Sequence, residues 1–113
     1  VMGDAAFGMA GLDIETAVRG KIPIITVILN NGVMTHYDHY MPYASEHWGS
    51  NRLTGEYAEI GAGLGAYAEK VETPDQLAPA IRRAVEANNE GRPAVLEMIT
   101  KVEETLSKYE ATE

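Results

Sequence analysis

The spacing of apolar residues changes along this chain, and the changes predict alternating helices and strands. From Met9 to Arg19 an apolar residue recurs every three or four positions, as on one face of a helix, and Gly20 is a suitable helix end. Residues 23–29 are almost continuously apolar and β-branched, which is typical of a strand buried on both faces. Val1 and Met2 indicate the end of an earlier strand. The helical stripe consists of Ala10, Ile14, Ala17 and Val18.

The second half of the chain repeats this alternation. Thr54 is expected to cap a helix, and residues 66–71 and 93–99 are expected to form strands. Between these strands, Thr73 precedes a proline and a glutamine at the spacing of a helix start, and this helix should run to Gly91. A second proline, at position 79, should disturb one of its early turns. The inner face of the first helix is formed by Tyr57, Ile60, Gly61 and Leu64, and that of the second by Leu77, Ala80, Ile81, Ala84 and Val85.

Strands that alternate with helices predict an α/β fold. Because two of the strands are almost entirely apolar, we expect a mostly parallel sheet with helices on both faces, a three-layer sandwich. At 113 residues the chain is expected to be a single, partial domain, residues 1–113. Residues 33–53 follow neither spacing and are interpreted as a functional loop with a short helix near its start.

The composition narrows the classes of function. With 17 acidic against 9 basic residues the formal charge is −8, which argues against binding nucleic acid and against an anionic membrane surface. There is no cysteine, which excludes a disulfide framework and thiolate chemistry. No apolar run approaches the ~20 residues of a membrane span and no leader is visible, so we expect a soluble, cytoplasmic protein.

Two short polar segments follow predicted strands and indicate a shared site. Gly3 and Asp4 come after the first strand, and Asn30 and Asn31 come after the second. In open α/β sheets ligands bind outside the carboxyl ends of the strands, where these segments face each other if the strands are neighbours. Their carboxylate, amide and carbonyl oxygens suit Mg²⁺, and a helix that begins near Ala6 offers N–H groups to a phosphate. The segments therefore predict one half of a metal–diphosphate clamp.

The stretch GDAAFGMAGLDIETAVRGKIPIITVILNNG resembles the signature of thiamine-diphosphate-dependent enzymes, in which Gly-Asp-Gly is followed by Asn-Asn after a helix and a strand. Asp4 and Asn31 lie 27 positions apart, the spacing that the family uses. The resemblance implies that the side chains of Asp4 and Asn31 and the backbone carbonyl of Val33 ligate Mg²⁺. The diphosphate would contact mainly backbone groups, those of Gly3, Ala5, Ala6, Met34 and Thr35.

Ala5 departs from the family pattern, since most members have glycine at that position. Alanine is acceptable there if the residue keeps a negative φ. The later stretch LTGEYAEIGAGLGAYAEKVETPDQLAPAIRRAV is similar to acetolactate-synthase-like carboligases, which implies decarboxylation of a 2-oxo acid and carbon–carbon bond formation. The alternatives are an oxalyl-CoA or 2-oxo-acid decarboxylase and, in a different class, a non-catalytic phosphate-binding or assembly module.

Members of this family are several times longer than this chain. The resemblance therefore implies that N-terminal domains of the same protein are missing, together with the glutamate that activates the cofactor. We expect the fragment alone to be inactive. The family's active site forms between two subunits, so a homo-oligomer is also expected. The expected substrate is a 2-oxo acid or an acyl-CoA.

His36 and Tyr37 are candidate catalytic residues, because their segment follows the metal turn directly and histidine titrates near neutral pH. His36 and His39 could also begin a transition-metal site, although a third ligand is not evident. The alternative is a polar loop that packs against a missing domain or a partner subunit. The aromatic residues Tyr40, Tyr43 and Trp48 could form a wall of the substrate pocket, or they could be buried in an interface with another domain or subunit.

Overall fold

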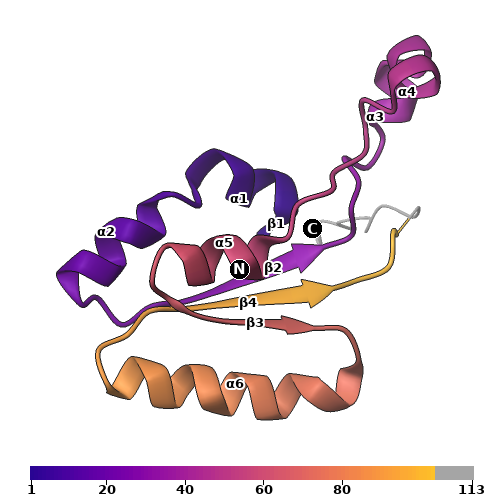
Figure 1. Ribbon diagram of the computed structural model, residues 1–113. Coiled ribbons are helices and arrows are strands. Elements are labelled where there is room, and N and C mark those ends of the chain that lie inside the picture. The colour runs from indigo at the N-terminus through magenta and orange to yellow at the C-terminus, as the bar shows by residue number, and fades with distance from the viewer. Residues whose placement is uncertain (104–113) are drawn as a thin grey trace, which may run out of the picture.

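The computed structural model describes residues 1–103, in which four parallel strands form one sheet (Figure 1). The strands are β1 (Met2–Gly3), β2 (Ile25–Asn30), β3 (Tyr67–Val71) and β4 (Ala94–Ile99), in the spatial order β1-β2-β4-β3. Ile28 is paired with Met2 on one side and with Glu97 on the other. Since all the strands are parallel, their carboxyl ends lie at one edge of the sheet, and the loops that follow them meet there.

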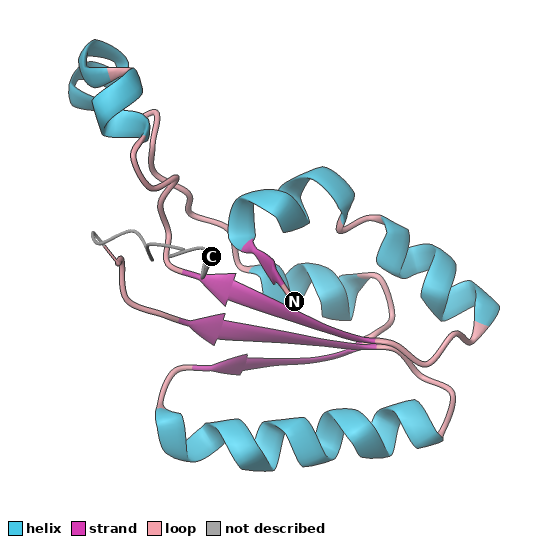
Figure 2. Ribbon diagram, turned by 180° about the vertical axis from the view of Figure 1, so that it is seen from behind, coloured by secondary structure: helices cyan, strands magenta, loops and turns pink. Residues whose placement is uncertain are grey.

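Helices cover both faces of this sheet, which makes a three-layer α/β sandwich as predicted. They are α1 (Asp4–Ala10), α2 (Asp13–Gly20), α3 (Tyr37–Tyr40), α4 (Pro42–Trp48), α5 (Tyr57–Gly63) and α6 (Pro74–Asn89). Helices α1, α2 and α5 lie on one face and α6 lies on the other (Figure 2). Helices α3 and α4 form an arm that projects beyond the carboxyl ends of the strands (Figure 1). None of the helices within residues 1–103 is long and apolar enough to cross a membrane.

Each face of the sheet has its own hydrophobic core. The core under α1, α2 and α5 consists of Phe7, Ile14, Ile28, Tyr57, Ala66 and Val95. The core under α6 consists of Val71, Ala80, Ala84, Ala94 and Leu96. Because side chains alternate along a strand, neighbouring residues of β4 belong to different cores, and this explains why the strand is apolar almost throughout.

The predicted helix from Met9 to Arg19 is wrong in its extent, because the segment forms two helices that separate at Gly11. A β-carbon on Gly11 would lie 2.6 Å from the ring of Phe7, so the chain turns closely over this ring and a new helix begins at Asp13. Gly20 is the last helical residue, as predicted. The left-handed conformation that ends the helix belongs to the next residue, Lys21 (φ 51°).

Two further helix predictions need correction. Thr54 is not a cap, because α5 begins at Tyr57 with Glu56 before it. The segment 33–53 contains two helices, α3 and α4, and not one. Their residues are not buried against the sheet, so the burial pattern that marks a core helix is missing from their sequence.

Helix α6 begins with the predicted capping box, in which the Gln76 side chain accepts a hydrogen bond from the Thr73 N–H at 3.2 Å. The helix then continues through Pro79 without interruption. Its buried face consists of alanines, whose small side chains let the helix lie close to the sheet. The predicted inner face is therefore only partly correct: Ala80 and Ala84 are buried, and the larger residues Leu77, Ile81 and Val85 are exposed along one flank.

The close approach of α5 to the sheet gives a test of the packing. We expect Gly61→Ala to lower the free energy of unfolding by about 1–3 kcal/mol, because the added methyl would lie 2.8 Å from Val95 Cβ. Gly63→Ala is the matched control, since no atom lies within 4 Å of its added methyl and alanine favours a helix. Urea denaturation followed by circular dichroism measures both. Equal stabilities for the two variants would contradict the packing of α5 on Val95.

Candidate functional site

Two loops meet at the carboxyl edge of β1 and β2, and Asp4 joins them. Asp4 follows β1 directly and is 4% exposed. One of its oxygens, Oδ1, accepts a hydrogen bond from the Ala5 N–H at 2.8 Å. The other, Oδ2, accepts one from the Gly32 N–H at 2.9 Å. The structure thus brings the first predicted segment against the second, which follows β2.

The turn after β2 is held in a defined shape. Gly32 has a φ of 70°, a left-handed conformation that favours glycine, and the Asn31 Oδ1 accepts a hydrogen bond from the Val33 N–H at 3.1 Å. Val33 lies opposite Arg52 in an isolated antiparallel bridge. The hydrogen bonds of this bridge belong to the residues on either side of Val33, so the Val33 carbonyl points away from the 51–53 segment.

These oxygen atoms are chemically suited to a hard cation. A carboxylate oxygen or amide oxygen that accepts one hydrogen bond keeps a second lone pair, so the hydrogen bonds of Asp4 and Asn31 leave each side chain free to accept a further contact. The described residues 1–103 contain no group of three or more His, Cys, Asp or Glu side chains that could hold a metal ion. In this part of the chain His36 and His39 therefore have no third side chain of these types with which to form a transition-metal site.

The predicted diphosphate contacts on the β1 side lie in the first turn of α1. Gly3 precedes this helix, and nothing lies within 4 Å of the place where its β-carbon would be. Ala5 and Ala6 are half-buried helical residues. Within residues 1–103 only Lys21 and His36 among the non-glycine residues have a positive φ, so Ala5 meets the condition under which alanine can replace the usual glycine.

Three of the predicted residues, Val33, Met34 and Thr35, line a cavity of about 410 Å³ beside the turn, whereas Asn31 lines a different cavity and Asp4 lines neither of the two. The lining of the 410 Å³ cavity consists of Val33, Met34, Thr35, His36, Asp38, Asn51 and Val102. His36 has a left-handed φ of 68°, and its Nε2 is buried without a hydrogen-bond partner in the described part of the chain. Tyr37 does not line this cavity and is 37% exposed. The structure thus separates the two catalytic candidates and turns only His36 toward the predicted cofactor residues.

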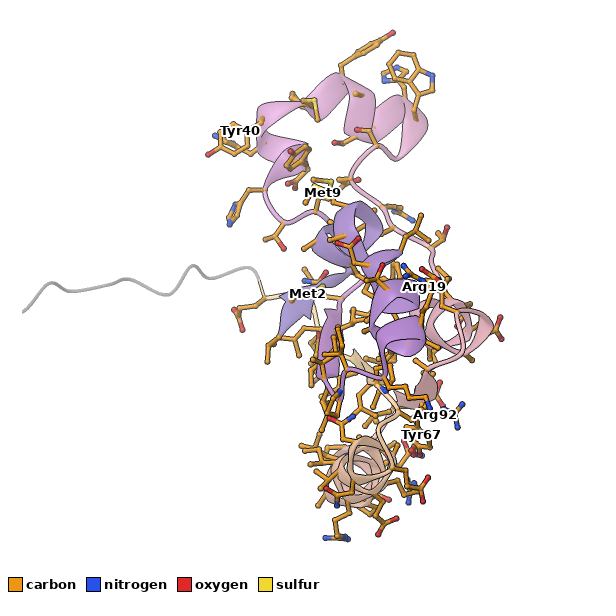
Figure 3. The ribbon with its side chains drawn as sticks, turned by 90° about the vertical axis from the view of Figure 1, so that its left-hand side faces the viewer. Met2, Met9, Arg19, Tyr40, Tyr67 and Arg92 are labelled. Atoms are coloured by element: carbon orange, nitrogen blue, oxygen red, sulfur yellow. The ribbon has the colours of Figure 1, made fainter. Side chains whose placement is uncertain are left out.

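The aromatic residues of the arm form a cluster that lies away from this cavity. The Tyr43 ring stacks on His47 with centroids 4.0 Å apart and meets Trp48 edge-on at 5.5 Å. Tyr43 and Trp48 are exposed, and Tyr40 points outward from the arm (Figure 3). In the described structure this cluster does not form a wall of the cavity.

The pattern of the sequence did not reveal Glu97 behind the turn, and it marked Asn30 only as the neighbour of Asn31. Glu97 lies in the middle of β4 with no exposed surface, and its oxygens accept hydrogen bonds from Asn30 Nδ2 at 2.6 Å and the Ala58 N–H at 2.7 Å. Asn30 Oδ1 in turn accepts a hydrogen bond from the Gly32 N–H at 3.0 Å. A single acid within an otherwise apolar strand is the signal that could have identified Glu97.

The pKa of Tyr57 depends on its burial and on both buried acids, Asp4 and Glu97. Burial raises the pKa of its phenol, and the negative charges of Asp4 and Glu97 raise this pKa further. Its ring packs edge-on against Phe7 with centroids 5.7 Å apart, which joins α5 to α1. The phenol therefore stays neutral beside the two carboxylates and adds no negative charge to the site.

Comparison with known proteins gives a family profile and full-length relatives. Residues 1–98 match the profile of the family described as thiamine pyrophosphate enzyme, C-terminal TPP binding domain. A probable acetolactate synthase of Mycobacterium bovis is 34% identical over 102 residues, which cover 88% of this chain and 18% of that protein. A 2-hydroxyacyl-CoA lyase of Oryza sativa subsp. japonica is 26% identical over 114 residues, with coverages of 88% and 18%.

Solved structures give the same fold. A thiamine diphosphate-dependent 4-hydroxybenzoylformate decarboxylase of Rhodococcus jostii RHA1 superimposes with a TM-score of 0.71 at 20% identity, covering 92% of this chain and 20% of that one. At this identity the likeness concerns the fold alone. The chain thus spans about a fifth of the length of the relatives and structures that it matches.

Proposed function

Because this chain belongs to the thiamine pyrophosphate enzymes, as a C-terminal TPP-binding domain, we propose that it anchors the diphosphate of the cofactor through Mg²⁺. The family predicted from the sequence and the class of thiamine-diphosphate-dependent enzyme are thereby confirmed. The particular residues that hold the ion and the cofactor are part of the proposal, as are the reaction and its substrate.

The proposed ion ligands are the carboxylate of Asp4, the amide oxygen of Asn31 and the backbone carbonyl of Val33. The observation that carries this assignment is the 2.9 Å hydrogen bond from the Gly32 N–H to Asp4 Oδ2, because it places the carboxylate beside the turn that contains the other two oxygens. Mg²⁺ usually takes one or two carboxylates and completes its octahedron with phosphate oxygens and water. A ligand set with a single carboxylate agrees with that preference.

The diphosphate would lie between the two loops, close to small residues. On the β1 side it would contact the backbone of Gly3, Ala5 and Ala6, where no large side chain prevents its approach. On the β2 side it would contact Met34 and Thr35, which line the 410 Å³ cavity. When it is bound, thiamine diphosphate supplies a carbanion-stabilising centre for reactions beside a carbonyl. The residues of this chain would hold and orient its diphosphate end.

For the complete protein we propose decarboxylation of a 2-oxo acid followed by carbon–carbon bond formation, as in acetolactate synthases. The 34% identity to the mycobacterial protein supports this choice over an oxalyl-CoA or 2-oxo-acid decarboxylase. Since the chain spans 18% of that relative, we propose that further domains of the same protein activate the cofactor and that the chain alone is inactive. The exposed aromatic cluster of the arm supports an assembly with such domains or with a second subunit.

His36 is the proposed group at the substrate end of the site, and Tyr37 is the competing candidate. His36 lines the cavity next to Val33 and has an unpaired, buried Nε2, which a bound substrate or cofactor could satisfy. Tyr37 shares neither property in the described structure, so His36 is the better supported of the two.

A calorimetric titration of the complete protein with thiamine diphosphate, with and without Mg²⁺, tests the anchor. We expect binding that requires Mg²⁺, and we expect Asp4→Ala to weaken it about 100-fold, because losing a charged contact of about 3 kcal/mol corresponds to two factors of ten. Asn31→Ala should weaken binding in the same direction. Asp13→Ala and Asn89→Ala are matched controls on exposed helical positions and should bind normally.

Normal, Mg²⁺-dependent binding by the Asp4→Ala variant would show that these residues are not the anchor. A phosphate ligand that binds without Mg²⁺, or an absence of any binding by the folded wild-type protein, would instead favour the non-catalytic phosphate-binding or assembly module. Thermal unfolding of each variant establishes that it is folded before its titration is interpreted.

The decarboxylation rate with pyruvate, measured at saturating cofactor and Mg²⁺, tests His36. We expect His36→Asn to lower kcat by about 100-fold, the usual effect of losing a proton-transferring group, without changing the affinity for thiamine diphosphate. His39→Asn, at an exposed position in the same segment, should keep the wild-type rate. If Tyr37→Phe lowers the rate and His36→Asn does not, the role belongs to Tyr37.

A further inference from the structure

Glu97 is a buried acid that the packing of the sheet does not explain. It lies on β4 between the parallel strands β2 and β3, with no exposed surface, and every other residue of that strand is apolar. A carboxylate in such a place is costly unless strong donors satisfy it. Here the donors are the side-chain amide of Asn30 and the N–H of Ala58, one for each oxygen.

In the part of the chain that the structure describes, no positive side chain forms an ion pair with Glu97. Lys70 is its register partner on β3, and the Lys70 Nζ forms its ion pair with Glu56 Oε2 at 2.7 Å. The ion pairs of residues 1–103 do not include Glu97. The carboxylate therefore acts through its hydrogen bonds, which connect α5 on one side with the end of β2 on the other.

The contact with Glu97 determines which way the Asn30 amide faces. A carboxylate only accepts hydrogen bonds, so the NH₂ end of the amide must point at Glu97. The oxygen end then points at the turn, where it accepts the Gly32 N–H at 3.0 Å. That same N–H also donates to Asp4 Oδ2 at 2.9 Å. Glu97, Asn30, Gly32 and Asp4 thus form one continuous chain of hydrogen bonds.

We propose that Glu97 is a positioning residue for the cation site. By orienting Asn30, Glu97 keeps the Gly32 N–H between its two acceptors, Asn30 Oδ1 and Asp4 Oδ2. The turn therefore keeps the shape in which the oxygens of Asn31 and Val33 would bind the ion. This inference rests on the proposed function of Asp4 and Asn31. It adds that the affinity for the ion depends on a residue that does not touch it.

Glu97→Gln tests the inference with almost no change in size. Glutamine has one accepting and one donating end, so if it keeps the Ala58 contact, its NH₂ group faces Asn30. The Asn30 amide must then turn over, which directs its own NH₂ group at the Gly32 N–H. We expect the Mg²⁺ concentration that half-saturates thiamine diphosphate binding to rise about tenfold, as is usual when an outer partner of a metal ligand is lost.

The double variant Asn30→Asp, Glu97→Gln exchanges the two groups and restores every hydrogen bond. The aspartate introduced at position 30 accepts from the new glutamine and from the Gly32 N–H, and the glutamine oxygen accepts from Ala58. We expect its half-saturating Mg²⁺ concentration to return to within about threefold of wild type, since the hydrogen-bond pattern and net charge are restored. Asn30→Asp alone places two carboxylates against each other and should disturb the turn.

Glu69→Gln is the matched control for the loss of a carboxylate from the sheet. Glu69 lies on β3, where it accepts a hydrogen bond from the Tyr67 hydroxyl at 2.6 Å and forms an ion pair with Arg83 of α6. It has no contact with the turn after β2. We expect its substitution to leave the Mg²⁺ dependence of thiamine diphosphate binding unchanged.

Titrations of the complete protein with Mg²⁺ at a fixed thiamine diphosphate concentration decide the question. A wild-type protein that binds without Mg²⁺ contradicts the proposed function itself. A wild type that needs Mg²⁺ together with a Glu97→Gln variant of unchanged affinity overturns only the positioning role. If Glu97→Gln does not fold, the double variant decides the question. A wild-type affinity of the double variant for Mg²⁺ supports the inference. A weakened affinity for Mg²⁺, or a double variant that does not fold, overturns it. A half-saturating Mg²⁺ concentration at or below that of wild type for Asn30→Asp alone would also overturn it, since the added charge would then explain the recovery in the double variant.

Discussion

The hydrogen bond from the Gly32 N–H to Asp4 Oδ2 joins two loops that are 28 positions apart, and the geometry of the site depends on it. Strand β1 contributes only two residues to the sheet, so few ladder contacts fix its position beside β2. A carboxylate as buried as that of Asp4 needs such donors, because removing it from water is otherwise costly. The requirement to satisfy Asp4 therefore determines where the β1 loop and the β2 turn lie relative to each other.

Two buried carboxylates, Asp4 and Glu97, lie at the two ends of the same chain of hydrogen bonds. Within residues 1–103 neither takes part in an ion pair, and their donors are backbone N–H groups and one side-chain amide. Hydrogen bonds thus satisfy both acids in the described part of the chain, although Lys70, whose pKa is raised mainly by its hydrogen bond with Glu56, also interacts with the charge of Glu97. The Tyr57 phenol, whose pKa is raised by burial and by these acids, stays neutral and adds no further negative charge. Two acids close to one turn favour a cation, and this supports the proposal of an ion site there and not at His36 and His39.

The sequence predicted those features that local chemistry determines. The β-branched run at 23–29 led to the sheet and the capping box at Thr73 led to α6. The places of Asp4 and Asn31 just after two strands led to the meeting of the two loops. The break at Gly11 depends on the ring of Phe7, and the alanine face of α6 depends on how closely the helix lies on the sheet, so neither is visible as a spacing. Glu97 was missed because its partners Asn30 and Ala58 are 67 and 39 positions away, and a periodic pattern contains no information about such contacts.

A crystal structure of the complete protein with thiamine diphosphate and Mn²⁺ in place of Mg²⁺ tests the central claim most directly. Mn²⁺ accepts the same oxygen ligands, and its anomalous scattering locates the ion independently of the surrounding density. We predict one ion within about 2.3 Å of an Asp4 carboxylate oxygen, Asn31 Oδ1 and the Val33 carbonyl, with diphosphate oxygens completing its coordination. An ion bound elsewhere, or a diphosphate held without contact to Asp4 and Asn31, would contradict this prediction.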